Sequence, residues 1–203
     1  MTEIIFVRHG ETVWHAENRY AGISDIALTA KGLEQGKKLA NWAETAQLSA
    51  IYSSELKRAK STAEFSCQKT GLELNVEKRL NEVNFGEGEG LTRAEMKLKF
   101  PEELAKFIEA PADNPLPDGE KGINAIERAN PVIKEIIEKY PKGKVLIVAH
   151  STLIRLLLCK FTNIDPNEYR TRFPEIENCA LNSLNFESDQ INVIELNHST
   201  SNY

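Results

Sequence analysis

The stretch Glu3-Ile-Ile-Phe-Val-Arg-His-Gly10, near the start of the chain, decides the fold class. It is a short run of β-branched and aromatic residues that ends at a glycine, which is typical of a strand buried on both faces. Lys144–His150 has the same pattern, and Leu48–Ser54 is a shorter version of it. Strands of this kind belong to parallel sheets, because helices cover both faces of such sheets.

Helical patterns lie between these strands. Apolar residues at three- and four-residue spacing predict four helices, over 30–43, 55–69, 122–140 and 151–159. The segment 179–196 has two alternating runs around Ser188-Asp189, which predicts an antiparallel hairpin. The sequence therefore predicts an α/β fold: a three-layer sandwich with a largely parallel central sheet, helices on both faces and an antiparallel edge hairpin near the C-terminus.

The domain organisation follows from what interrupts this pattern. We find no repeat, long linker or change of composition, so the whole chain, 1–203, is expected to be one domain. The segment 110–119 holds three of the eight prolines, and we expect 101–119 to form a loop or flap over a site. The polar tail 198–203, which includes His198, is expected to be disordered. Thr92 and Glu95 are spaced as a capping box, a structural feature.

Composition excludes several classes of protein. Of 203 residues, 25 are Lys or Arg and 30 are Asp or Glu, so the net charge of −5 argues against a nucleic-acid binder. Apolar runs are far shorter than the ~20 residues that span a bilayer, and the first residues do not resemble a secretory leader. The three cysteines are far apart and lack metal-ligand spacing. We expect a cytoplasmic protein without a metal ion and without a membrane or nucleic-acid partner.

Histidines and arginines stand where the predicted strands end. Arg8 and His9 follow the first strand, Arg58 lies on the first turn of the helix after the second, and His150 ends the third. Ligands of open α/β sheets bind beyond the carboxyl ends of the strands, and arginines with a helix N-terminus suit a phosphate dianion. Positive neighbours would keep His9 neutral and nucleophilic. A lone histidine at a strand end is more often a structural residue, but the four matching positions together favour a site.

The motifs around these residues resemble one family. Arg8-His9-Gly10-Glu11-Thr12 is similar to the signature of the histidine phosphatase superfamily, in its phosphoglycerate-mutase-like branch. The matching blocks run in the family's order from residue 3 to about residue 186. The further blocks are Leu28–Gly32, Tyr52–Ala63, Leu80–Gly90 and Val148–His150.

The resemblance implies a role for each residue. His9 would be the nucleophile that takes the phosphoryl group, and Glu82 would act as acid and then as base. Arg8, Arg58 and His150 would hold the phosphoryl oxygens, with no metal or cofactor. Further phosphate or substrate contacts are implied at three positions: His15, Gly22 and Ser151.

Three positions depart from the family pattern. His15 stands where Asn is common, and Ser151 where Gly is common; the Ser151 hydroxyl is a favoured helix cap, so little harm is expected. Lys121 follows Gly119-Glu120 where Ser is frequent. A solvated lysine and a contact to an anionic substrate both remain open for it.

The predicted function is a metal-independent phosphomonoesterase that hydrolyses a small phosphorylated metabolite through a phosphohistidine. A cofactor-dependent phosphoglycerate mutase is the alternative, disfavoured because no Arg-rich insert lies between Gly90 and Gly119. A binding module without activity is disfavoured because His9, Glu82 and His150 are all present. The resemblance extends to alpha-ribazole, sugar-phosphate and phosphoserine phosphatases, among which the sequence does not choose. A homodimer is an open alternative.

Overall fold

A six-stranded sheet, in the order β3-β2-β4-β1-β5-β6, forms the middle of the protein. The computed structural model describes residues 1–187 and 190–203. The strands are β1 (Thr2–Arg8), β2 (Ala50–Ser53), β3 (Leu74–Val76), β4 (Lys144–Ala149), β5 (Leu181–Glu187) and β6 (Gln190–His198). The first four are mutually parallel, and β5 and β6 add an antiparallel hairpin at one edge. The predicted sheet is confirmed, while the predicted turn at 188–189 lies outside the described residues.

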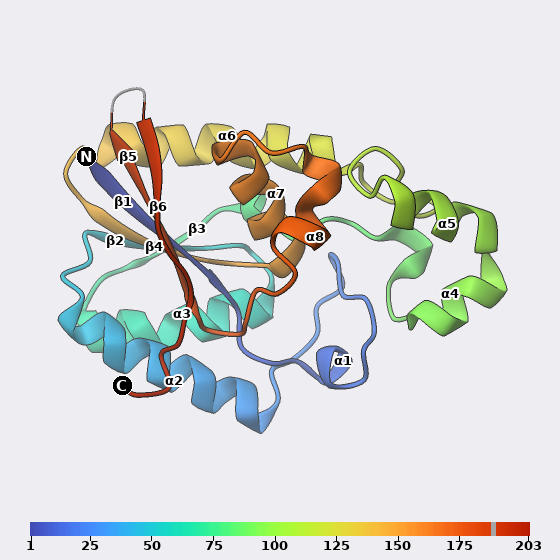
Figure 1. Cartoon of the computed structure of the whole chain (residues 1–203). Helices are drawn as coiled ribbons and strands as arrows, with labels where there is room; N and C mark the ends of the chain where they lie inside the picture. Colours follow the sequence, from blue (N-terminus) through green and yellow to red (C-terminus); the bar gives the residue numbers. More distant parts are fainter. Residues whose placement is uncertain (188–189) are drawn as a thin grey trace.

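Helices cover both faces of this sheet, which completes the predicted three layers (Figure 1). The helices are α1 (Val13–Ala16), α2 (Ala30–Thr45), α3 (Lys57–Thr70), α4 (Arg93–Lys99), α5 (Pro101–Glu109), α6 (Gly122–Lys139), α7 (Ser151–Phe161) and α8 (Tyr169–Arg172). Short 3-10 turns occupy Lys78–Leu80, Gly86–Gly88 and Pro166–Glu168. Over the described part of the chain, none of the helices combines the length and the apolar character needed to cross a bilayer.

The central strand β1 explains why the first stretch of the sequence is so apolar. Successive side chains of a strand point to opposite faces. Ile4 and Phe6 pack in the core beneath α6 and α7, whereas Ile5 and Val7 pack in the core beneath α2 and α3. All four are fully buried, so the strand is apolar on both faces, as the sequence predicted.

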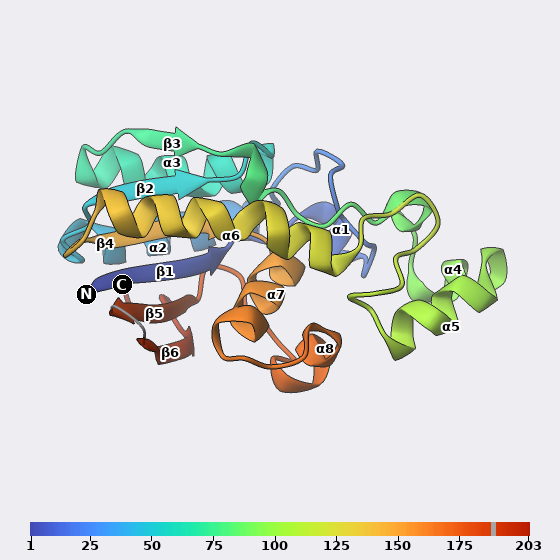
Figure 2. The ribbon, with the colours of Figure 1, turned by 90° about the horizontal axis from the view of Figure 1, so that it is seen from above.

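The segment expected to be a flap is partly helical, which corrects the prediction. Residues 101–109 form α5, with Pro101 at its first position and Leu104 and Phe107 buried on one face. Proline is tolerated at the first position of a helix, where its missing N–H has no partner to lose. Pro101 therefore marks the start of a helix here and does not indicate a loop. The predicted capping box of Thr92 and Glu95 is confirmed at the start of α4. In Figure 2, α4 and α5 project beyond the carboxyl ends of the parallel strands.

The C-terminal tail also differs from its prediction. His198 is the last residue of β6 and pairs with Leu181. Thr200 is 5% exposed, and its hydroxyl donates a hydrogen bond of 2.9 Å to the carbonyl of Cys179. Polar composition suggested disorder, but the strand pairing of His198 and the buried hydroxyl of Thr200 hold this segment against the fold.

Candidate active site

The order of the strands brings the predicted histidines and arginines together. β1 and β2 both pair with β4, so the three strand ends that carry these residues are adjacent. The rings of His9 and His150 have centroids 5.1 Å apart. The Nε of Arg58 donates a hydrogen bond of 3.1 Å to Nε2 of His9. The predicted convergence of the strand ends is therefore confirmed.

His9 is held with one ring nitrogen free of a proton. Its Nδ1 lies 2.7 Å from the carbonyl of Gly10, an acceptor, so Nδ1 carries the proton and Nε2 presents the lone pair that Arg58 contacts. Burial lowers the pKa of His9 well below its usual value, and the charges of Arg58 and Arg8 lower it further. The sequence predicted a neutral ring from the charges alone, whereas loss of hydration is the larger cause.

Arg58 is fixed by the loop that follows β1. It is 1% exposed, and its guanidinium donates to the carbonyls of Gly22 at 2.6 Å and Ser24 at 2.7 Å. Glu89 in turn accepts the N–H groups of Ile23 and Ser24. A Cβ at Gly22 would lie 2.5 Å from the carbonyl oxygen of Val83 and 2.9 Å from the backbone nitrogen of Phe85, so only glycine fits there.

Gly22 has a different role from the one that the sequence predicted for it. Its carbonyl binds Arg58, and it is not among the residues that line the pocket described below. Gly22 therefore helps to position the guanidinium of Arg58.

His150 is oriented by a serine on the neighbouring strand end. Ser54 accepts the N–H of Leu56, and its Oγ lies 2.7 Å from Nε2 of His150. When the Ser54 hydroxyl donates to Nε2, the proton of the neutral ring sits on Nδ1, which has no partner among the described residues. Burial, followed by the charge of Arg58, lowers the pKa of His150 well below its usual value. The ring is thus a neutral donor whose free N–H can meet a phosphoryl oxygen.

Glu82 caps helix α7 from a distant part of the chain. Its Oε1 accepts the N–H groups of Val83 and Leu153, both at 2.9 Å, and its Oε2 accepts that of Thr152 at 3.0 Å. A helix N-terminus favours such a carboxylate. From the sequence we expected these N–H groups to be free for phosphate and the Ser151 hydroxyl to cap helix α7. Instead the N-cap residue is His150, without a side-chain cap hydrogen bond, so that expectation was wrong.

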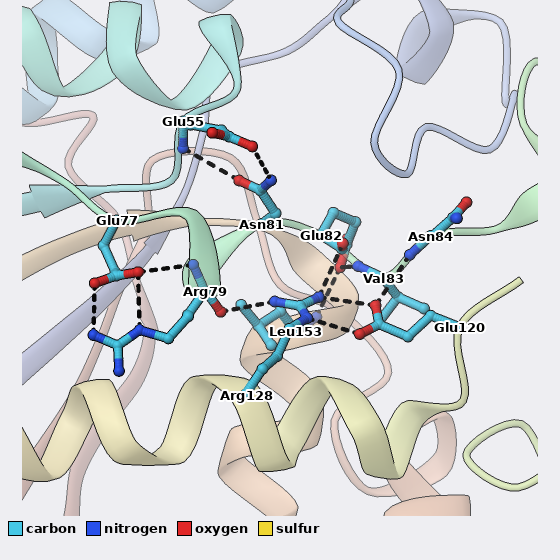
Figure 3. Close-up of polar contacts among 10 residues, drawn as sticks. All are labelled: Glu55, Glu77, Arg79, Asn81, Glu82, Val83, Asn84, Glu120, Arg128 and Leu153. Atoms are coloured by element: carbon cyan, nitrogen blue, oxygen red, sulfur yellow. Dashed lines mark hydrogen bonds and ion pairs between the residues drawn. The ribbon is translucent and has the colours of Figure 1, made fainter.

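The backbone of Glu82 is held by an arginine that the sequence analysis did not single out (Figure 3). Arg128, on α6, donates to the carbonyls of Arg79 at 2.7 Å and Glu82 at 3.1 Å. Its guanidinium also pairs with Glu120 at 2.7 Å. Glu120 therefore supports the segment that carries Glu82, through Arg128.

A pocket of about 250 Å³ opens beside this cluster. Five of the predicted site residues line it: Arg8, His9, His15, Glu82 and Ser151. Arg58 and His150 lie deeper, in contact with His9. Nε of Arg8 and Nδ1 of His15 are buried without a hydrogen-bond partner among the described residues. Burial lowers the pKa of Arg8 to about 10, so this guanidinium stays charged at neutral pH.

The predicted flap does not line this pocket. Within the described chain, no residue of 101–119 is among the lining residues. Instead Phe107 of α5 packs against Tyr20 and Phe85, which do line it, with ring centroids 6.2 Å away in each case. The expectation of a flap over the site is therefore corrected: α5 supports the wall of the pocket from behind.

Three arginines of the lining were not foreseen: Arg19, Arg155 and Arg170. Arg155, on α7, and Arg170, on α8, both face the pocket. Arg155 follows Ser151 by four residues, so the helical repeat alone would have put it on the same face. Arg170 lies on a helix of four residues that no periodicity indicates. Elsewhere, residues 1–187 and 190–203 contain no group of three or more His, Cys, Asp or Glu that could hold a metal ion.

Comparison with known proteins identifies the family. The family described as the histidine phosphatase superfamily (branch 1) matches residues 4–199. The chain belongs to the histidine phosphatase superfamily. The resemblance noted from the sequence is confirmed over nearly the whole chain, and the protein is an enzyme of the phosphatase type.

Relatives within the superfamily carry several names. Phosphoserine phosphatase 1 of Hydrogenobacter thermophilus is 30% identical over 83% of this chain and 80% of its own. A probable phosphoglycerate mutase of Escherichia fergusonii is 30% identical over 94% of this chain and 87% of its own. Among solved structures, a mycobacterial glucosyl-3-phosphoglycerate phosphatase superposes with a TM-score of 0.89 at 25% identity, covering 97% of this chain and 99% of that one.

Proposed function

We propose that this histidine phosphatase hydrolyses a small phosphomonoester through a phosphohistidine at Nε2 of His9. One observation carries the proposal: a neutral, oriented imidazole lines a pocket and presents its lone pair beside Arg58, with His150 next to it. A nucleophile beside cationic and N–H donors is what transfer of a phosphoryl group requires. None of the steps that we propose uses a metal ion.

In the first step the phosphoryl group passes from the ester oxygen to Nε2 of His9. The hydrogen bond that Nε of Arg58 donates to Nε2 is exchanged for one to a phosphoryl oxygen, which frees the lone pair. The P–O bond breaks as the P–N bond forms, and the proton stays on Nδ1, hydrogen-bonded to the carbonyl of Gly10, which stabilises the ring as it gains positive charge. Arg8, Arg58 and His150 hold the phosphoryl oxygens. Donors fixed before the reaction need no reorganisation as charge develops, which makes this kind of stabilisation large.

Glu82 serves the leaving group. Its Oε2 accepts one backbone N–H where Oε1 accepts two, so Oε2 has the freer lone pair for a proton. We assign to it the proton that the departing alkoxide takes. In the second step the same oxygen receives a proton from the water that attacks phosphorus; the P–N bond then breaks and inorganic phosphate leaves.

The size of the pocket supports a small substrate. Its volume of about 250 Å³ is below the usual range of ~300–1,000 Å³ for sites that hold drug-sized ligands. A phosphoryl group and a leaving group of a few carbon atoms fit that space. The relatives named for phosphoserine and for glucosyl-3-phosphoglycerate support a phosphorylated metabolite as the class.

A phosphoglycerate mutase is the second candidate, because one relative over 94% of the chain carries that name. A mutase must return the phosphoryl group to its acceptor before water arrives. Incubation with 3-phosphoglycerate, followed by ³¹P NMR, separates the two: a phosphatase releases inorganic phosphate, whereas a mutase yields 2-phosphoglycerate.

The proposal is tested by trapping the intermediate. Rapid mixing with p-nitrophenyl phosphate and an alkaline quench should leave an acid-labile phosphoryl group on the peptide that contains His9. His9→Ala should abolish both the adduct and turnover, with or without chelator. His198→Ala, an exposed histidine of β6, is the matched control and should change neither. A fully active His9→Ala protein, or an adduct on another residue, would overturn the proposal.

A further inference from the structure

The outer wall of the pocket carries two positive charges that the proposed chemistry does not use. Arg155 and Arg170 line the pocket from α7 and α8. Among the described residues, neither guanidinium has a carboxylate within 4.0 Å, whereas Arg19, Arg79, Arg128 and Arg172 all form ion pairs. These two arginines are therefore unpaired in a concave and partly desolvated place.

Arg155 is held by one contact and keeps another donor free. One terminal nitrogen donates to the carbonyl of Pro174 at 2.6 Å, while Nε is buried and has no acceptor in the described part of the chain. Burial lowers the pKa of Arg155, and the charge of Arg170 lowers it further. Glu82 and Glu175 oppose this shift, but neither reaches ion-pair distance among the described residues. A buried cationic donor without a partner is costly, which marks a place where a ligand completes the structure.

Arg170 is positioned by aromatic rings. Its guanidinium carbon lies 4.4 Å from the centroid of the Phe107 ring and 5.2 Å from that of Tyr169. One nitrogen contacts the carbonyl of Phe107 at 3.4 Å. A guanidinium stacked in this way loses little freedom on binding and presents its remaining N–H groups in a fixed plane, which suits a carboxylate or a phosphate.

The charges of the pocket can be assigned group by group. The transferred phosphoryl group binds to Arg58 and His150 at the bottom of the pocket and to Arg8 at its side. Arg8 and Arg155 repel each other, since Arg155 lowers the pKa of Arg8. A single phosphate leaves the Arg155 and Arg170 charges uncompensated. A second negative charge on the substrate would compensate them.

We propose that Arg155 and Arg170 form a leaving-group subsite that selects phosphomonoesters with a second anionic group, a carboxylate or another phosphoryl group. This inference rests on the proposed phosphatase function and adds the class of its substrate. Arg155 and Arg170 line the same pocket as His9, which places the second anion on the same substrate as the ester. Charge-assisted, two-point contacts from guanidinium groups provide the discrimination against neutral leaving groups.

Three esters of one carbon skeleton test this subsite. We would measure kcat/KM for glycerol 3-phosphate, 3-phosphoglycerate and glycerol 1,3-bisphosphate. At least one of the two anionic esters should exceed the neutral one about tenfold or more, the factor expected from a charge-assisted hydrogen bond. Which of them does so identifies the second group as carboxylate or phosphoryl.

Variants then assign the preference to the two arginines. Arg155→Gln and Arg170→Gln should each reduce the ratio of anionic to neutral ester by about tenfold, and the Lys variants should restore part of it. Arg172→Gln, on the same short helix but paired with Glu168, is the matched control and should keep the ratio. The ratio is an internal standard, so a loss of folded protein does not move it.

Two outcomes would overturn the subsite. Equal kcat/KM for the three esters, or variants that lower all three equally, would leave the phosphatase intact and remove the second-anion class. Failure to hydrolyse any of the three, together with p-nitrophenyl phosphate, would instead overturn the proposed function itself.

Discussion

The bottom and the rim of the pocket are built in opposite ways. At the bottom, His9, Arg58 and His150 are at most 6% exposed, and each is oriented by a hydrogen bond to a neighbour. At the rim, His15 and Arg155 are half-buried and keep buried nitrogens without partners in the described chain. The bottom is oriented in the free protein and keeps one unpaired nitrogen, Nδ1 of His150, among the described residues, whereas the rim residues combine unpaired nitrogens with partial exposure.

The difference separates two tasks. Groups that are already oriented can act on the same phosphoryl group whatever ester brings it, because that part of the substrate does not change. Unpaired donors at the rim can only be satisfied by the part of the substrate that does change. We therefore expect substitutions at the bottom to affect all esters alike and substitutions at the rim to affect some esters more than others.

Glu82 lies on the border between the two regions, and its replacement should have the largest effect. Glu82→Gln keeps the shape of the side chain but removes the acid, so hydrolysis of an alkyl phosphate should fall at least ~10²-fold. p-Nitrophenyl phosphate should suffer less in the phosphorylation step, because its leaving group departs without a proton. Single-turnover measurements would separate the two esters.

Glu87→Gln is the matched control for that experiment, because Glu87 is a nearby carboxylate that pairs with Lys99 on the surface. It should leave both rates unchanged. Equal losses for the alkyl and the aryl ester in Glu82→Gln would contradict the assignment of Glu82 as proton donor.

Arg58 tests whether the bottom is indifferent to the leaving group. Arg58→Ala removes charge-assisted hydrogen bonds of about 1.5–3 kcal/mol each, so kcat/KM should fall at least about tenfold for every ester. The control is Lys57→Ala, one residue earlier on α3, where the side chain is exposed. Losses of kcat/KM that differ strongly between alkyl and aryl esters would contradict the inference that residues at the bottom affect all esters alike.

The two buried histidines predict a dependence of stability on pH. Their pKa values are lowered in the folded protein, mainly by burial, so below about pH 6.5 the unfolded chain binds protons that the folded chain does not. Stability should therefore fall as the pH decreases from 7.5 to 5.5, by up to about 1.4 kcal/mol for each histidine. Urea denaturation at several pH values would measure the free energy of unfolding of the protein and of His150→Asn. The slope of this free energy against pH should be smaller in the variant. An unchanged slope would show that His150 titrates normally.

Ser54 should give the smallest effect on kcat/KM, because it acts on the reaction through the orientation of His150 and does not itself hold the phosphoryl group. Removing one neutral hydrogen bond of about 0.5–1.5 kcal/mol predicts a decrease of up to about tenfold in kcat/KM for Ser54→Ala, equal for all esters. Ser66→Ala is the control, since Ser66 is also buried on the α3 side but its hydroxyl has no partner in the described chain. A decrease no larger than in the control would exclude an orienting role.

The bottom of the site could be predicted from the sequence for a physical reason. Its residues stand at the ends of apolar strands, and parallel strands deliver their carboxyl ends to one edge. The places of Arg8, His9 and His150 at the ends of the strand patterns therefore indicate a shared site. The remaining step, that β2 and β1 both neighbour β4, is one of few topologies that right-handed crossovers allow.

The rim could not be predicted in the same way. Arg170 lies on a single turn of helix, and its position depends on stacking against Phe107 from another segment. The capping of α7 by Glu82 likewise joins residues far apart in the chain, so local rules chose Ser151 instead. Helix α5 was missed because proline-rich composition outweighed the burial of Leu104 and Phe107, which only the tertiary fold decides.

The pairing of β1 has a consequence for how the protein is made. β1, the strand that ends beside His9, is synthesised before the other strands of this sheet, yet Glu3 pairs with Lys144 and Thr2 with Phe186. At ribosomal rates of about 5–20 residues per second, β1 waits roughly 10–40 s for its second partner. Both edges of this apolar strand are open until β4 is made, and one edge stays open until β5 is made, so the strand has to be kept from pairing with other nascent chains. A chain cut short before β5 would leave the strand of His9 with one exposed edge.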